Sequence, residues 1–178
     1  MKWPNVATEQ VTTRLDLVNE LEQRQSRTIW AARWTPFDPE QKSPTLIAKV
    51  ISAKRAASIA REYFIYTRIV PQLSAAAQTF FPPLQGVYRS GMDGQAYVVL
   101  LECSGVVVTT KQLDKDEELR KRIRTALDLI KSEGLSQFNE AVFKVVRRED
   151  GRIFIVDWGE AMLTPSFNLS LSLESSVN

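Results

Sequence analysis

The residues from Gly151 to Ala161 form the part of this chain whose types and order most suggest chemistry. A turn leads into an apolar run that is typical of a β-strand, and the run ends on an acid, an aromatic residue and a glycine, Asp157-Trp158-Gly159. This order delivers a carboxylate at the C-terminal end of a strand. A carboxylate so placed can hold a divalent metal ion against phosphate groups. Asp157 is therefore a candidate metal ligand.

The composition excludes several other kinds of active site. The chain has 178 residues and no histidine. Serine–histidine and cysteine–histidine nucleophile pairs are therefore excluded, as are histidine-ligated metals. The single cysteine, Cys103, cannot form an internal disulfide, and its apolar neighbours favour an ordinary core cysteine.

Charge and hydropathy predict an ordinary globular protein. Hydrophobic residues make up 44% of the chain and charged residues 25%, with a formal net charge of +2. No basic block suggests a nucleic-acid partner, and no apolar run is long enough to cross a membrane. The N-terminus lacks the apolar core of a secretory signal, and one cysteine suits a reducing compartment. We therefore expect a cytoplasmic protein.

The rest of the sequence predicts the elements that must hold the carboxylate in place. Residues 15–21 permit either a strand or a helix, and the polar residues 22–27 predict a turn. Two long helices are expected over 53–70 and 114–132, because apolar residues recur along one face at a spacing of three to four. Runs rich in β-forming residues predict strands over 28–34, 45–51, 84–88, 97–101, 142–146 and 153–156.

This order of elements resembles the N-lobe of a protein kinase followed by the first part of its C-lobe. Asp157-Trp158-Gly159 resembles the Asp-Phe-Gly motif of kinases, whose acid binds metal. Two further segments, Phe81–Tyr88 and Leu101–Gly105, resemble those of small kinase-like proteins common in fungi. The resemblance extends from Leu15 to Ala161.

The resemblance implies a kinase-like α+β fold in three parts. Residues 1–102 would form the N-lobe, a five-stranded antiparallel sheet with one helix. Residues 103–161 would form a truncated C-lobe of a long helix and a β-hairpin, without the helices that follow in kinases. Residues 162–178 would be a flexible tail.

The resemblance also implies a set of nucleotide-binding residues. Lys49 matches the lysine that pairs with phosphates, and Glu62 matches the helix glutamate that orients it. Glu102 and Cys103 fall in the hinge that would contact an adenine. Asp157 would be the metal ligand.

The chain departs from the family in the loop that covers the phosphates. Kinases use glycines there so that the backbone can approach the phosphates, whereas this chain has Glu22, Arg24 and Arg27 at the glycine positions. Their side chains would crowd a phosphate, and Glu22 would repel it. Arg24 and Arg27 could form an anion clamp, but a solvated charged turn is the expected arrangement.

The catalytic loop departs further. The general base of the family is replaced by Asn139, which cannot accept a proton, and the metal-binding asparagine is replaced by Lys144, whose charge repels Mg²⁺. Glu140 is expected to be a solvated acid rather than a displaced base. An ion pair between Lys144 and Asp157 could close the site.

These losses favour a catalytically inactive pseudokinase that serves as a protein-interaction or regulatory module, such as an effector or a decoy for another kinase. No cofactor is expected, and any ATP binding should be weak and little helped by Mg²⁺. The alternative is an ATP-binding phosphotransferase with a divergent active site, because Lys49, Glu62 and Asp157 remain.

A truncated C-lobe also predicts a partner. An apolar stripe on the second long helix would lack the helices that cover it in a complete kinase. We therefore expect a homodimer or a tight protein complex at this surface, or a tail that folds back through residues 169–173. The stripe consists of Leu119, Ile123, Leu127 and Ile130.

Overall fold

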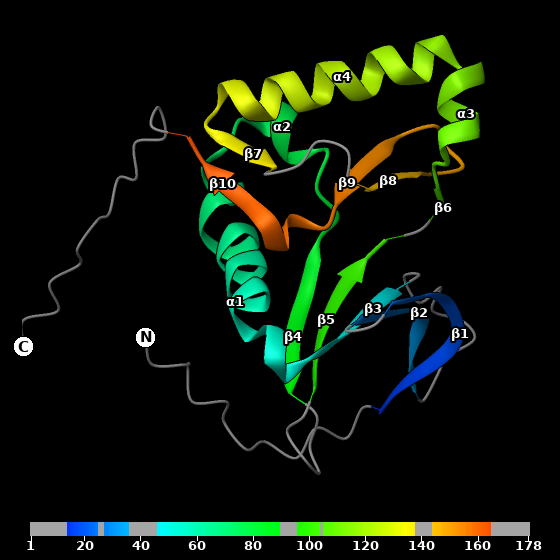
Figure 1. Ribbon diagram of the computed structural model, residues 1–178, viewed down its shortest axis with the longest axis vertical. Coiled ribbons are helices and arrows are strands. Elements are labelled where there is room, and N and C mark those ends of the chain that lie inside the picture. The colour runs from blue at the N-terminus through cyan, green and yellow to red at the C-terminus, as the bar shows by residue number, and fades with distance from the viewer. Residues whose placement is uncertain are drawn as a thin grey trace, which may run out of the picture.

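The protein is described by a computed structural model that covers residues 14–24, 27–35, 46–89, 96–103, 105–137 and 144–164. This part of the chain is an α+β fold built on a five-stranded antiparallel sheet, as predicted (Figure 1). Residues 36–45 and 90–95, which connect strands of this sheet in the sequence, lie outside the described residues.

The large sheet has the strand order β1-β2-β3-β5-β4. Its strands are β1 (Arg14–Arg24), β2 (Arg27–Thr35), β3 (Leu46–Ser52), β4 (Leu84–Arg89) and β5 (Ala96–Glu102). The ambiguous first segment is thus a strand. The predicted turn over 22–27 is too long, because Glu22 and Arg27 belong to β1 and β2, which pair as far as Arg24 opposite Arg27.

The first predicted helix is a composite rather than one regular helix. It consists of a 3-10 turn η1 (Ala53–Arg55), α1 (Ala56–Phe64), a π-helical turn η2 (Ile65–Ile69) and a 3-10 turn η3 (Val70–Gln72). A short helix α2 (Ala75–Gln78) follows. Ile59 and Glu62 are the buried residues of α1, so the charged Glu62 shares the inward face with an isoleucine.

The second half of the fold is made of one long helix and short strands. Its elements in chain order are β6 (Val106–Val107), α3 (Thr110–Lys115), α4 (Glu117–Ser132), β7 (Leu135–Gln137), β8 (Lys144–Arg147), β9 (Ile153–Val156), the 3-10 turn η4 (Trp158–Glu160) and β10 (Ala161–Leu163).

These short strands form two small sheets. β6, β8 and β9 form one, and β7 pairs with β10 to form the other. The predicted hairpin between β8 and β9 is present, with Lys144 opposite Val156. The predicted tail boundary at 162 falls inside β10, because Met162 pairs with Ser136.

The long helix begins later than predicted. Asp116 is the N-cap of α4, and its carboxylate accepts a hydrogen bond of 2.9 Å from the Leu119 backbone N–H. The preceding residues form the separate helix α3, whose N-cap Thr109 makes a reciprocal capping box with Gln112. The two successive N-caps explain why two helices are found where one was predicted.

The apolar stripe of α4 is covered within the chain, which overturns the expected exposure. Leu119, Ile123 and Ile130 are at most 4% exposed, and Leu127 is half-buried. In Figure 1, α4 lies at the end of the molecule opposite β1 and β2, with β8 and β9 between them. The stripe packs into the same core as β8, β9, α1 and Trp158.

No helix in the described ranges is long and apolar enough to cross a membrane.

Candidate functional site

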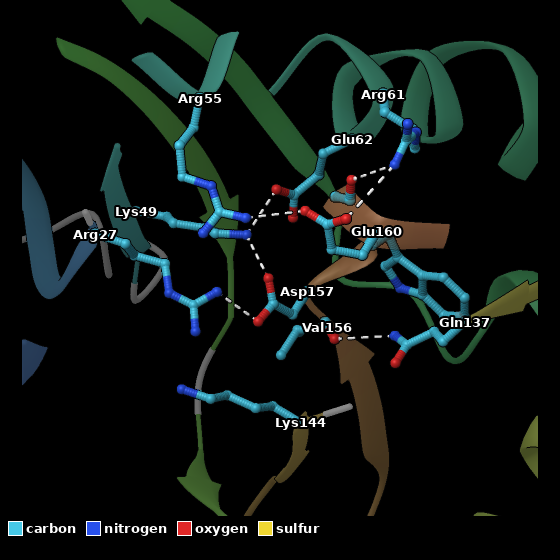
Figure 2. Close-up of polar contacts among 12 residues, drawn as sticks. Arg27, Lys49, Arg55, Arg61, Glu62, Gln137, Lys144, Val156, Asp157 and Glu160 are labelled. Atoms are coloured by element: carbon cyan, nitrogen blue, oxygen red, sulfur yellow. Dashed lines mark hydrogen bonds and ion pairs between the residues drawn. The ribbon is translucent and has the colours of Figure 1, made fainter. Parts of the chain in front are cut away.

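Three charged residues predicted to act together meet between the large sheet and α1. Lys49 of β3 donates a 2.7 Å hydrogen bond from Nζ to Oε2 of Glu62 on α1. The same ammonium donates a second bond of 2.7 Å to Oδ1 of Asp157, which follows β9 (Figure 2). Lys49 and Glu62 are 6% and 1% exposed. The lysine therefore joins a sheet, a helix and a strand end.

Both oxygens of the Asp157 carboxylate are engaged by cations. Oδ1 accepts from Lys49, and Oδ2 accepts a 2.5 Å hydrogen bond from Nη1 of Arg27 (Figure 2). Burial alone would raise the pKa of this carboxyl group, but Lys49 and Arg27 outweigh burial and lower the pKa to about 2. Asp157 is therefore ionised at neutral pH and already neutralised by its neighbours.

Lys49 is held in its charged form by the same contacts. Burial would lower the pKa of its ammonium, yet the charges of Glu62 and Asp157 outweigh burial and raise the pKa above its usual value. The buried ammonium is thus a fixed positive charge across the physiological range.

Arg27 does not lie in a solvated turn, contrary to expectation. Its side chain is 12% exposed, and besides Asp157 it contacts Oε1 of Glu22 at 3.8 Å. The alternation of side chains along β2 places Arg27 on the face that carries the site, where Asp157 supplies a buried anion. Arg27 is an internal partner of Asp157.

Lys144 also has a partner other than the expected one. Its ammonium forms an ion pair with Oε2 of Glu22, whereas no direct pair joins it to Asp157 in the described part of the chain. In Figure 2 the Lys144 side chain extends past Asp157 instead of toward its carboxylate. Burial lowers the pKa of Lys144, and the charge of Asp157 partly opposes that shift.

The site is therefore a chain of alternating charges, which we call the charge network. It contains three cations and three anions, so its formal charge is zero. All six side chains are at most 24% exposed. In order of contact its members are Glu62, Lys49, Asp157, Arg27, Glu22 and Lys144.

The backbone around Asp157 explains why the segment reads Asp-Trp-Gly. Asp157 adopts a left-handed conformation with φ 76° and ψ 51°, a region that aspartate tolerates better than most residues. Trp158 is fully buried, stacks on Phe81 at 4.8 Å between ring centroids and donates from Nε1 to the Ile155 carbonyl at 2.9 Å. The buried indole anchors the turn that presents Asp157.

Gly159 allows this turn to approach α1 closely. A Cβ atom at Gly159 would lie 2.3 Å from Oγ of Ser58, far inside van der Waals contact. The Gly159 carbonyl accepts a 3.3 Å hydrogen bond from Arg61, and Glu160 forms an ion pair of 3.0 Å with Arg55 (Figure 2). Turn η4 and helix α1 are therefore held together, which fixes Glu62 relative to Asp157.

An apolar cavity of about 90 Å³ adjoins the charge network. Cys103 lines it and is buried, which agrees with the expected core cysteine, and burial raises the pKa of its thiol to about 11. Ligand pockets typically measure about 300–1,000 Å³, so the cavity is too small for a nucleotide without widening. Its apolar lining comprises Leu21, Ile29, Ile47, Leu101, Val107, Val146 and Val156.

Among the other predicted site residues, the structure describes the side chain of Glu102. Glu102 is not among the described residues that line the cavity; its side chain accepts from Gln85 at 3.1 Å, and its backbone N–H donates to the Pro83 carbonyl at 2.9 Å. Asn139, Glu140 and the side chain of Arg24 lie outside the described residues.

A metal centre finds little support in the residues that the structure describes. They contain no group of three or more histidine, cysteine, aspartate or glutamate side chains placed to hold a metal ion. Asp157 is the nearest candidate ligand, but Lys49 and Arg27 occupy both of its oxygens. A cation would have to displace at least one of them.

The sequence pointed to Lys49, Glu62 and Asp157, which do meet, but not to the role of Arg27. Arg27 and Asp157 are separated by 130 positions, and a lone arginine in a polar stretch carries no local sign of a distant partner. Arg61 and Arg55, which fix η4 to α1, were missed for the same reason.

Comparison with known proteins identified no relative of this chain. No protein-family model matches the chain, and a search of curated proteins found no match.

Proposed function

We propose that this chain is a kinase-like, catalytically inactive module that works by binding another protein. The observation that carries the proposal is the contact of Lys49 with both Glu62 and Asp157, at 2.7 Å each. The kinase resemblance predicts these residue types on a sheet strand, on the following helix and at a later strand end. A kinase-like fold accounts for their meeting in one place.

The rest of the charge network supports the loss of phosphoryl transfer. Catalysis of this reaction depends on cations that neutralise phosphate charge and on a base that accepts a proton. Here the formal charge of the network is zero, and Arg27 and Lys49 are engaged with acids of the chain itself. A phosphate group entering the site would have to break those ion pairs.

An ATP-binding phosphotransferase with a divergent active site is the second candidate. The fixed positive charge of Lys49 and the pairing of this lysine with Glu62 favour it, because this pair orients the phosphate-binding lysine in kinases. Such an activity requires ATP and metal to displace Arg27 from Asp157 and to widen the cavity.

A titration of the purified chain with ATP, with and without Mg²⁺, separates the two candidates. We expect no phosphate transfer to generic substrates and a thermal shift with ATP that Mg²⁺ does not increase. Transfer that is lost in Lys49→Ala, or micromolar Mg²⁺-dependent ATP binding that is lost in Asp157→Ala, would establish the second candidate. Each variant is first checked for a cooperative melt, because both residues also stabilise the fold.

The proposal of a protein partner depends on a separate observation. The covered stripe of α4 removes the original reason for a partner, yet several large apolar side chains stay exposed elsewhere. Another protein chain, such as a second kinase or a second copy, is the class of partner that these side chains suit. They are Leu17, Val18 and Leu21 on β1, Tyr88 on β4, Val106 and Val107 on β6, and Met162 and Leu163 on β10.

A further inference from the structure

The apolar cavity beside the charge network has a buried oxygen in its lining that lacks a hydrogen-bond donor. Glu62 lines this cavity and is 1% exposed. Its Oε2 accepts the bond from Lys49 (Figure 2), whereas Oε1 has no hydrogen-bond partner within the described part of the chain. The hydroxyl of Tyr66, four positions later in the chain, does not donate to it. Because a buried acceptor without a donor is costly, the place beside Oε1 favours a bound donor.

The size and the lining of the cavity restrict what can bind there. Its volume is about 90 Å³, and most of its lining is aliphatic. Because an apolar cavity of about 150 Å³ holds a benzene molecule, this cavity suits a smaller body of about five heavy atoms. The aliphatic lining favours a body that is mainly apolar.

The cavity is partly open to the surface between β1 and β6. Leu21 of β1 and Val107 of β6 both line it, and they are 49% and 47% exposed. These two side chains form an apolar entrance. A small apolar molecule can therefore reach the cavity past aliphatic side chains.

The charge network decides which charge an occupant can carry. Its three acids and three cations balance, so its formal charge is zero. A charged molecule in the cavity would leave an uncompensated charge in a poorly hydrated place. A neutral molecule avoids this cost, and one N–H or O–H group on it can donate to Oε1 of Glu62.

We propose that the cavity binds a small neutral molecule, mainly apolar and about five heavy atoms in size, that donates one hydrogen bond to Oε1 of Glu62. A lone water molecule could also donate to Oε1, but it needs about two to four polar partners, and most of the lining is aliphatic. The inference does not depend on the kinase-like function, because this ligand is not a nucleotide and uses the oxygen that Lys49 leaves.

Pyrrole and furan are matched probes of the proposed hydrogen bond. Both are neutral aromatic rings of nearly the same size, but only pyrrole carries an N–H donor. In NMR titrations of the methyl-labelled protein, pyrrole should bind saturably and at least about tenfold more tightly than furan, because it donates to a charged acceptor. Nuclear Overhauser effects from pyrrole to methyl groups of Ile29, Ile47 and Leu101 should place it in the cavity. Absent binding, or equal affinities for the two rings, would overturn the proposal and leave the cavity to water.

Two exposed valines of β6 provide a matched test of where the ligand enters. Val107 lines the cavity, whereas Val106 is not among the described residues that do. Val107→Trp should weaken pyrrole binding by at least about fivefold, because the indole takes up the space of the entrance. Val106→Trp should leave the affinity as it is. Both positions are exposed, so both variants should fold. Equal pyrrole affinity in the two variants would overturn the assignment to this cavity.

Glu62→Gln tests the acceptor itself. The amide carbonyl should keep the bond from Lys49, which turns the NH₂ group toward the cavity, where it cannot accept a hydrogen bond from pyrrole. A variant with a cooperative thermal melt should therefore bind pyrrole no more tightly than furan. Retention of the tenfold preference would overturn the role of Oε1. If this variant does not fold, the two ring probes and the two valine variants decide the proposal by themselves.

Discussion

Arg27 and Asp157, which lie 130 positions apart, are joined by a hydrogen bond of 2.5 Å from Nη1 to Oδ2. The bond connects the second strand of the large sheet to the end of β9. It also places a guanidinium where a bound metal ion would have to be. The same contact therefore stabilises the fold and occupies the candidate metal ligand.

Removal of Arg27 should make Asp157 available to a cation. In Arg27→Ala, Oδ2 loses its donor, and the affinity for Mn²⁺ should rise by about tenfold, or ~1.4 kcal/mol. Isothermal titration calorimetry or the paramagnetic signal of Mn²⁺ measures this change. Arg33→Ala, at an exposed position of the same strand, is the control and should leave the affinity as it is. Equal affinities in all three proteins would show that Arg27 does not compete with metal.

Stability should decline in acid because of Asp157. Its pKa is about 2 in the folded state against an ordinary value of 3.8, so the ionised carboxylate favours the folded state. That contribution is complete above about pH 4 and is lost as the pH falls toward 2, with a total of about 2 kcal/mol. Urea denaturation across this range should show a smaller pH dependence in Asp157→Asn than in the parent. Identical slopes would contradict the assignment.

Lys49 and Glu62 should show strong energetic coupling. Lys49→Met should cost about 3–5 kcal/mol, because it leaves the buried Glu62 carboxylate without its cation. Glu62→Gln should cost less, because Lys49 keeps its bond to Asp157. The double variant should cost less than the sum of the two, with a coupling of ~1–3 kcal/mol in a double-mutant cycle. The exposed pair Arg152 and Asp150 serves as the control and should show almost none. Additive effects at Lys49 and Glu62 would mean that the ion pair contributes little.

Gly159→Ala should destabilise the fold, and a second substitution should repair part of the damage. The new Cβ would meet Oγ of Ser58 at 2.3 Å, and the resulting shift of η4 against α1 should cost about 1–3 kcal/mol. Ser58→Ala removes that oxygen and should recover part of the loss in the double variant. Ser58→Ala alone is the reference. A thermal melt in which the second change gives no recovery would rule out this contact as the cause.

Much of the fold could be predicted because its larger elements have clear periodicity. The strands of the large sheet and the stripe of α4 span enough residues for alternation or a three-to-four spacing to be visible. β6, β7 and β10 have two or three residues each, so no pattern could reveal them. These undetected strands are part of the half of the fold that covers α4, which is why its stripe was wrongly expected to be exposed.

The residues of the candidate site also differ in how well the sequence predicts them. Lys49, Glu62 and Asp157 could be located because the first two lie within a recognisable strand and helix and the third directly follows a recognisable strand. Glu22 and Arg27 could not, because charged residues in a short polar stretch favour a turn unless a distant partner is known. Their partners, Lys144 and Asp157, lie more than 100 positions later in the chain.

The balance of three cations and three anions also restricts how this sequence can diverge during evolution. A change of sign or a neutral replacement at one member of the charge network leaves an uncompensated charge in a poorly hydrated place. Substitutions tolerated by selection should therefore come in pairs, Arg27 with Asp157 and Glu22 with Lys144. Among descendants of this gene these positions should covary, while the exposed arginines of α4 drift independently of one another.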